Sequence, residues 1–123
     1  MGRSYKDLVA WQKAMDLVTT YRSTATLPKE EQFGLTSQLR RAAVSIPSNI
    51  AEGQGRLLER DVRHFLGLAR GSLMEVETQF QTAQNPGYIE AAQTLALLRM
   101  PAEVGRIRNG LMASICQLPD PAH

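Results

Sequence analysis

The stretch ERDVRHFLGLARGSLMEVETQFQTAQ, residues 59–84, carries the most regular apolar pattern in the chain. Its apolar side chains recur at alternating intervals of four and three positions, which places them on one face of a helix. These positions are Val62, Leu66, Ala69, Leu73, Val76, Phe80 and Ala83. Phe65 and Leu68 flank this seam and widen it, as expected of a helix that packs against several neighbours. Residues 59–84 are therefore predicted to form a long helix in a bundle.

Helical periodicity continues on both sides of this stretch. Apolar positions three and four apart predict helices over about residues 7–25, 34–52 and 88–117. The first helix is expected to bury Leu8, Trp11, Met15 and Val18, and the second Leu35, Leu39, Ala42 or Ala43, Ile46 and Ile50. No stretch sustains the alternation of a β-strand, and short connections favour antiparallel neighbours. The sequence thus predicts an all-α, antiparallel up-down-up-down four-helix bundle, formed as a single domain over residues 1–123.

Two prolines fall inside the predicted helices. Proline lacks the backbone N–H that a helix needs, so we expect Pro47 to kink or break the second helix and Pro101 to kink the fourth. Around Pro47 the run SIPSNIAEG, residues 45–53, is rich in polar groups. We interpret its hydroxyls and its Asn49 amide as partners for the backbone carbonyls that Pro47 leaves unpaired, in preference to a ligand site.

The fourth predicted helix carries two apolar series. One is Leu95, Leu98, Ala102, Gly105, Met112 and Cys116, and the other is Leu97, Val104, Ile107, Leu111, Ile115 and Leu118. In a small bundle one series covers the core, so the other is most simply explained by contact with another subunit. We therefore expect a homo-oligomer, whose symmetry the apolar pattern alone does not specify.

The composition describes a small globular chain. It has 123 residues, of which 43% are hydrophobic and 21% charged, and this size suits one core rather than two. No apolar run is long enough to span a membrane, and charge near the N-terminus argues against a signal peptide. We therefore expect a cytoplasmic protein. The lone Cys116 has no partner for a disulfide or a Cys-x-x-Cys metal site, and we expect it to be buried and unreactive.

Arginines in the middle of the chain are the candidates for binding a partner. The chain as a whole is only mildly basic, since 14 Lys and Arg against 12 Asp and Glu give a net charge of +2. Guanidinium groups bind phosphate bidentately, so these arginines could meet a nucleic-acid backbone. They are Arg40, Arg41, Arg56, Arg60 and Arg63. The competing interpretation is a solvated face on which arginines pair with Glu52, Glu59 and Asp61, and the sequence leaves both open.

Catalytic and metal chemistry have little support in the sequence. His64 and His123 are the two histidines, which is too few for the paired carboxylate-histidine motifs of bundle metal sites. Asp61-x-x-His64 is a single partial match to that motif, and no second fixed imidazole is available for a triad. We expect no catalytic residue, no metal, no cofactor and no small-molecule substrate.

Four segments together resemble a known bacterial family, the 23S rRNA intervening-sequence proteins. They are YKDLVAWQKAMDLV at 5–18, SIPSNIAEG at 45–53, FLGLARGSLMEVETQ at 65–79 and GRIRNGLM at 105–112. The resemblance implies an up-down four-helix bundle, similar in fold to the accessory variability proteins of diversity-generating retroelements. It further implies a cyclic homopentamer with a basic character suited to RNA or DNA, and it offers no catalytic residues. Pro101 and the low net charge depart from the usual pattern of the family.

Two functions of different classes follow from these observations. The first is a non-enzymatic, homo-oligomeric bundle, a pentamer by resemblance, that binds structured RNA or other nucleic acid through the five arginines. The alternative is a protein-interaction scaffold without nucleic-acid binding. In the scaffold the arginines pair, within or between subunits, with Glu52, Glu59, Asp61, Glu75 and Glu77. An enzyme ranks last, because no nucleophile-base pair is recognisable.

Overall fold

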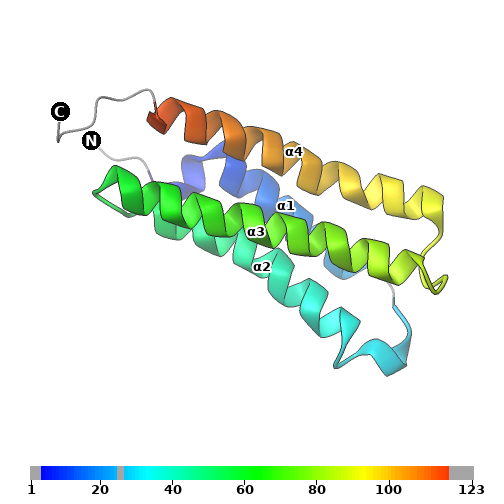
Figure 1. Ribbon diagram of the computed structural model, residues 1–123. Helices are drawn as coiled ribbons and strands as arrows, with labels where there is room; N and C mark the ends of the chain where they lie inside the picture. The colour runs from blue at the N-terminus through cyan, green and yellow to red at the C-terminus, as the bar shows by residue number, and fades with distance from the viewer. Residues whose placement is uncertain (1–3, 25–26, 117–123) are drawn as a thin grey trace.

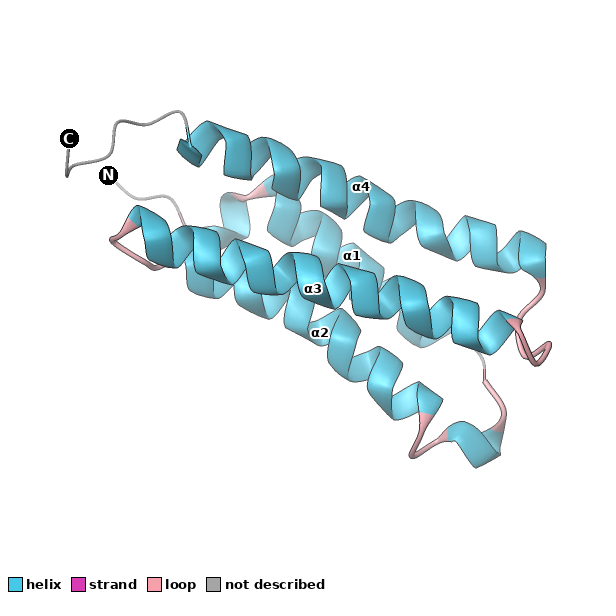
Figure 2. Cartoon of the chain, viewed as in Figure 1, coloured by secondary structure: helices cyan, strands magenta, loops and turns pink. Residues whose placement is uncertain are grey.

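The computed structural model describes residues 4–24 and 27–116, and these form four long helices (Figure 1). The helices are α1 (Val9–Thr24), α2 (Leu35–Gln54), α3 (Glu59–Gln84) and α4 (Ala91–Cys116). Two short 3-10 helices, η1 (Tyr5–Asp7) and η2 (Lys29–Glu31), precede α1 and α2. Figure 2 shows no strand among the described residues, so the all-α prediction is confirmed for them.

The four helices lie lengthwise beside one another, and consecutive helices are joined at alternate ends of the molecule (Figure 1). The most extensive contact is between α2 and α3, while α1 packs against α2 and α4, and α4 packs against α3. Each helix therefore has two neighbours, which is the packing expected of a bundle. In the described part of the chain, no helix is long and apolar enough to cross a membrane.

The core confirms the predicted faces of α2 and α3. In α3 the seam is buried from Leu66 to Ala83, and Phe80 is fully buried, while Val62 is half-buried. In α2 the predicted positions are all buried, including both Ala42 and Ala43. The rings of Phe80 and Tyr21 meet edge to face with their centroids 4.6 Å apart, so α1 and α3 touch in the core near their C-terminal ends.

The predicted apolar face of α1 lies at the edge of the core, where Leu8, Trp11 and Val18 pack against it, rather than at its centre. The residues buried in this helix are Ala10, Ala14, Leu17 and Tyr21. The predicted face is rotated outward: Leu8, Trp11 and Val18 are half-buried, and Met15 is 38% exposed. Small alanines let a helix backbone approach the core closely, whereas the larger apolar side chains lie along the boundary with α2.

In α4 one apolar series faces inward, as predicted. Leu97 and Val104 are buried, together with Thr94, Pro101 and Arg108, at alternating intervals of three and four. The other series lies farther out, because Leu95 is 67% exposed and Leu98 is half-buried. The helix begins at Ala91 rather than at residue 88, after a turn in which Gly87 has a φ of 86°. The side chain of Cys116, and the whole of His123, lie outside the described residues.

Neither proline breaks its helix, so the break considered at Pro47 is wrong. In α2 the Ser48 hydroxyl donates to the Val44 carbonyl (2.9 Å) and the Asn49 amide donates to the Ser45 carbonyl (2.8 Å). The carbonyl whose helical donor Pro47 removes is that of Ala43, so these bonds serve the next two carbonyls and not the one that the prediction concerned. In α4 the proline removes the N–H that would bond to the Leu97 carbonyl, and the Tyr21 hydroxyl donates to that carbonyl instead (3.0 Å).

Small residues form the seam between α2 and α3. The Ser45 hydroxyl is hydrogen-bonded to the Ser72 hydroxyl, which in turn donates to the Leu68 carbonyl (3.1 Å). Nearer the connection between the helices, Gly53 is buried against Phe65, so that a Cβ atom at position 53 would lie 3.2 Å from the Phe65 Cβ. The two backbones therefore approach closely along this seam.

Candidate nucleic-acid interface

The structure divides the five predicted arginines into two groups. Arg40 and Arg41 lie in the first half of α2, whereas Arg56 follows the end of α2, and Arg60 and Arg63 lie in the first turns of α3. All five are exposed. The rise of an α-helix separates Arg41 from the end of α2 by about 20 Å. The five arginines therefore do not form one patch.

Arg56 is held in place from two sides. Its Nη2 atom lies 2.8 Å from Glu52 Oε2, one helical turn earlier. Its guanidinium also lies over the ring of Phe65, 4.5 Å from the centroid, in a cation-π contact that joins the α2–α3 connection to α3. Such a guanidinium is oriented before any ligand arrives.

Arg60 and Arg63 have looser partners. Arg60 lies 3.8 Å from Asp61, and Arg63 lies 3.9 Å from Glu59. Exposed ion pairs of this kind contribute about 0–1 kcal/mol and are screened by salt. The pairs with Glu52, Glu59 and Asp61 are those that the competing interpretation predicted, but they are weak enough for a phosphate to replace them.

Arg40 and Arg41 differ from the other three in their surroundings. Within the described part of the chain, neither makes an ion pair with an acidic side chain. Arg40 lines a small pocket that also contains Val18 and Tyr21 of α1. The pair is therefore available to an external anion, although it lies far from Arg56.

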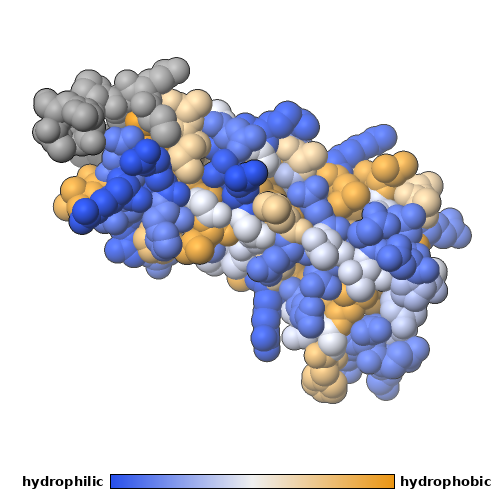
Figure 3. Space-filling model, in the orientation of Figure 1, coloured by the Kyte–Doolittle hydropathy of each residue, from blue (hydrophilic) through white to orange (hydrophobic). Residues whose placement is uncertain are grey.

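An apolar groove runs along the boundary between α1 and α2. We call it the α1–α2 groove, and it is lined by Tyr5, Trp11, Met15, Val18, Thr19, Val44, Pro47, Ser48 and Ala51. Tyr5 and Trp11 contact each other edge to face at one end, with centroids 5.3 Å apart. Trp11, Met15 and Val18, from the predicted apolar face of α1, thus contribute to this surface. On the face drawn in Figure 3, over α3 and α4, hydrophobic residues lie in separate patches among hydrophilic ones.

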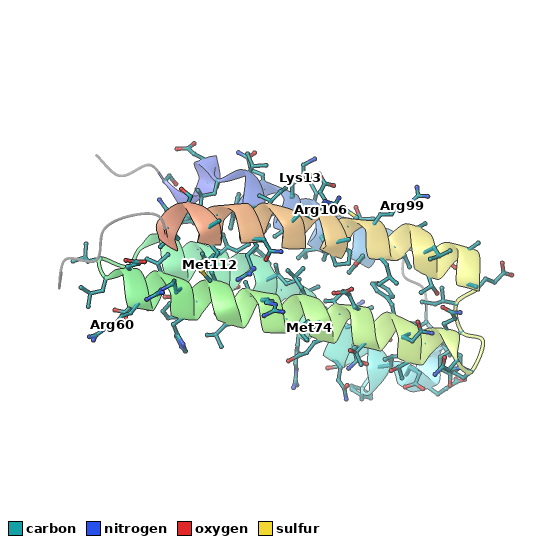
Figure 4. The ribbon with its side chains drawn as sticks, turned by 45° about the horizontal axis from the view of Figure 1, so that its top comes forward. Lys13, Arg60, Met74, Arg99, Arg106 and Met112 are labelled. Atoms are coloured by element: carbon teal, nitrogen blue, oxygen red, sulfur yellow. The ribbon has the colours of Figure 1, made fainter. Side chains whose placement is uncertain are left out.

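The sequence interpretation missed a second set of cations on α3 and α4. Arg70, Arg106 and Arg108 line one groove between these helices, together with Asn109. Figure 4 shows Arg99 and Arg106 on α4, Lys13 on the neighbouring α1, and Arg60 at the start of α3. A signal was present in the sequence, because Arg108 continues the inward spacing of Leu97, Pro101 and Val104. A charged residue at a core-facing position is as informative about a binding site as an exposed arginine.

The described residues offer little for metal or acid-base chemistry. Among residues 4–24 and 27–116, no three His, Cys, Asp or Glu side chains gather closely enough to hold a metal ion. His64 is exposed, and its ring contacts the ring of Phe65, with centroids 5.3 Å apart.

Comparison with known proteins agrees with the resemblance seen in the sequence. Residues 6–110 match the family model described as 23S rRNA-intervening sequence protein, and the match includes α1, α2, α3 and most of α4. No curated protein matches the chain.

Proposed function

We propose that this chain, which belongs to the 23S rRNA-intervening sequence protein family, is a non-enzymatic homo-oligomer that binds the phosphate backbone of structured RNA or other nucleic acid. The observation that carries it is the group formed by Arg56, Arg60 and Arg63 at one end of the molecule. One of these guanidinium groups is already oriented, and the other two have partners that a phosphate can displace.

The proposal includes the antiparallel up-down-up-down order of the helices. Connections at alternate ends of the molecule and the two-neighbour packing of each helix support it. In this order the α2–α3 connection and the N-terminus of α1 share one end with the C-terminus of α4. Arg56, Arg60 and Arg63 then lie at an end of the bundle, where a ring of subunits would repeat them.

Self-association is supported by apolar surface on two sides of the bundle. The α1–α2 groove presents Trp11, Met15 and Val44, and the outward series of α4 presents Leu95. A symmetric assembly that covered one of these surfaces would multiply the arginine group by the number of subunits. The resemblance implies a pentamer, and light scattering would measure the number directly.

The test is a binding titration against a structured rRNA fragment, duplex DNA and a non-nucleic polyanion, at several salt concentrations. We expect affinity to fall steeply with the logarithm of salt concentration and to favour nucleic acid over the polyanion. The triple variant Arg56→Ala, Arg60→Ala, Arg63→Ala should flatten the salt dependence, because each lost phosphate contact removes about 0.9 from the slope on B-DNA.

The matched control removes the same charge elsewhere. Lys13, Lys29 and Arg99 lie away from the α2–α3 connection, so the variant K13A/K29A/R99A lowers the net charge equally. It should keep most of the salt slope. If both triple variants bind alike, or if neither loses affinity, the assignment to Arg56, Arg60 and Arg63 is wrong. The variant R40A/R41A then tests whether the pair on α2 carries the contact.

A protein-interaction scaffold is the second candidate. The ion pairs of Arg56, Arg60 and Arg63 with neighbouring acids favour it, since each arginine already has an intramolecular partner. Under this function the wild-type protein assembles but binds neither nucleic acid, even at low salt. Capture of a partner protein would then depend on the α1–α2 groove and not on the arginines.

A further inference from the structure

Arg108 carries a charge into the core without an acidic partner. The residue is 6% exposed, on the inner face of α4. Its Nη1 donates to the Leu66 carbonyl (3.1 Å) and its Nη2 to Asn109 Oδ1 (2.6 Å), so both of its partners are neutral. Among the described residues, its Nε has no hydrogen-bond partner at all.

The surroundings of Arg108 increase the cost of this charge. Burial, and next the positive charge of Arg70, lower the pKa of Arg108 from its ordinary value. Arginine nevertheless stays protonated at any physiological pH, so the charge cannot be removed by releasing a proton. A buried charge without a counter-ion is destabilising, and an anion supplied from outside would offset that cost.

An open groove gives such an anion access to this site. We call it the α3–α4 groove, and its lining includes Arg70, Glu77, Arg106, Arg108 and Asn109. Three arginines and one glutamate give it a formal charge of +2. Met74 on α3 and Arg106 on α4, both labelled in Figure 4, belong to the same lining.

We propose that the α3–α4 groove binds a phosphate-bearing anion, with Arg108 as its innermost contact and Arg70 and Arg106 at its rim. A phosphate oxygen would replace Asn109 Oδ1 as the acceptor for Arg108 Nη2. A phosphate dianion matches the charge of +2, whereas a carboxylate would leave one positive charge unbalanced. The source is either a free phosphate compound or a nucleic-acid phosphate, and the experiment separates the two.

This inference does not rest on the proposed function. The groove is formed by α3 and α4 and contains none of the five arginines considered for the nucleic-acid interface. A protein that binds no nucleic acid can still bind inorganic phosphate here. Conversely, an interface at Arg56, Arg60 and Arg63 does not require the groove.

The test measures the melting temperature of the full chain in inorganic phosphate and in chloride, at equal ionic strength. We expect phosphate at about ten times its Kd to raise Tm by about 5 °C. Phosphate also stabilises proteins by exclusion from their surfaces, so the difference between variants is decisive. Arg99→Met, an exposed arginine of α4 outside the groove, should keep the full response.

Three variants should lose the response. Arg108→Met removes the buried charge, and Arg70→Met removes a rim charge from an exposed position where folding is not at risk. Asn109→Asp puts a carboxylate where the amide oxygen now accepts from Arg108, so it should raise Tm in chloride and abolish the phosphate response. If phosphate stabilises all four variants as it does the wild type, the groove is not an anion site.

A second arm identifies the source of the phosphate. A single-stranded oligonucleotide and inorganic phosphate are each titrated against wild type and R70M. Loss of affinity for both ligands in R70M supports a site that also accepts nucleic-acid phosphates. Loss of affinity for inorganic phosphate alone supports a site for free phosphate compounds. Unchanged affinity for both overturns the proposal.

Discussion

The hydroxyl of Tyr21 donates a 3.0 Å hydrogen bond to the carbonyl of Leu97, which stands four positions before Pro101. In an unbroken helix that carbonyl would accept from the N–H of residue 101, and a proline has none. A side chain of α1 thus supplies the hydrogen bond that the backbone of α4 lacks at this position. The continuity of α4 through Pro101 depends on this contact from another helix.

The variant Tyr21→Phe tests this dependence. It leaves the buried Leu97 carbonyl without a donor, so we expect a loss of about 1–3 kcal/mol in the free energy of unfolding. In a Pro101→Ala background the backbone N–H returns, and the same change should cost less. Denaturant unfolding of the four proteins in a double-mutant cycle measures the coupling. Equal costs in both backgrounds would show that the hydroxyl does not compensate for the proline.

The same tyrosine predicts a loss of stability at alkaline pH. Burial in the core, and next the negative charge of Glu77, raise the pKa of Tyr21 well above its ordinary value of 10.0. The unfolded chain ionises this phenol near pH 10 while the folded protein keeps it protonated, so rising pH favours unfolding. This group should not affect the pH dependence below about pH 9, and should reduce stability by about 1.4 kcal/mol per pH unit above about pH 10.

Tyr21→Phe is also the control for that measurement, because it removes the one group concerned. Denaturant midpoints recorded from pH 8 to pH 11 should fall more steeply for the wild type than for the variant. Parallel curves would assign the alkaline loss to other groups.

Two helical glycines should respond to alanine with opposite signs. Gly71 has nothing within 4 Å of a new Cβ atom, so Gly71→Ala should gain about 1 kcal/mol from helix propensity alone. At Gly53 the same Cβ would lie 3.2 Å from the Phe65 Cβ and 3.5 Å from the Val62 carbonyl oxygen. Overpacking costs about 1–3 kcal/mol, so Gly53→Ala should lower Tm. A rise in Tm for both variants would mean that the α2–α3 seam can accommodate an added methyl group at position 53.

Charge in the α1–α2 groove should disrupt self-association. Val44 is 45% exposed and lines the groove, so Val44→Glu would place a carboxylate in any interface formed there. Leu68, 43% exposed on α3, lies outside the groove, and Leu68→Glu is the matched control. By light scattering we expect V44E to approach the 13.6 kDa monomer while L68E assembles like the wild type. If V44E still assembles like the wild type, the interface is not in the α1–α2 groove. The outward series of α4, which includes Leu95, is then the candidate interface.

The sequence predicted those parts of the fold in which most of the buried side chains are large. In α3, from Leu66 to Phe80, most of the inner residues are large and apolar, so periodicity located the face correctly even though Leu68 and Met74 on the same helix are exposed. In α1 it did not, because Ala10 and Ala14 are the inner residues and alanine is a weak hydrophobic signal. Larger neighbours formed a second face at the same spacing and misled the prediction.

The candidate site was predictable only where it is local in sequence. The pairing of Arg56 with Glu52 follows from a spacing of four positions near the end of a helix. The contact of Arg56 with Phe65 depends on how the chain turns between α2 and α3, which no spacing specifies. Arg108 could have been identified from its spacing, because it continues the inward series of Leu97, Pro101 and Val104, whereas the exposed Arg106 of the same segment does not.

The close approach of α2 and α3 limits which side chains the α2–α3 hairpin can accommodate. Where Ser45 meets Ser72 and Gly53 meets Phe65, every added atom must push two backbones apart. Exchange of either serine for alanine is tolerable there, whereas at Gly53 even one added methyl group is not. Side-chain size is not limited in this way on the outer surfaces of α1 and α4. The outer residues of α1 and α4 can therefore be substituted to change the surface, while the residues of the α2–α3 seam stay almost unchanged.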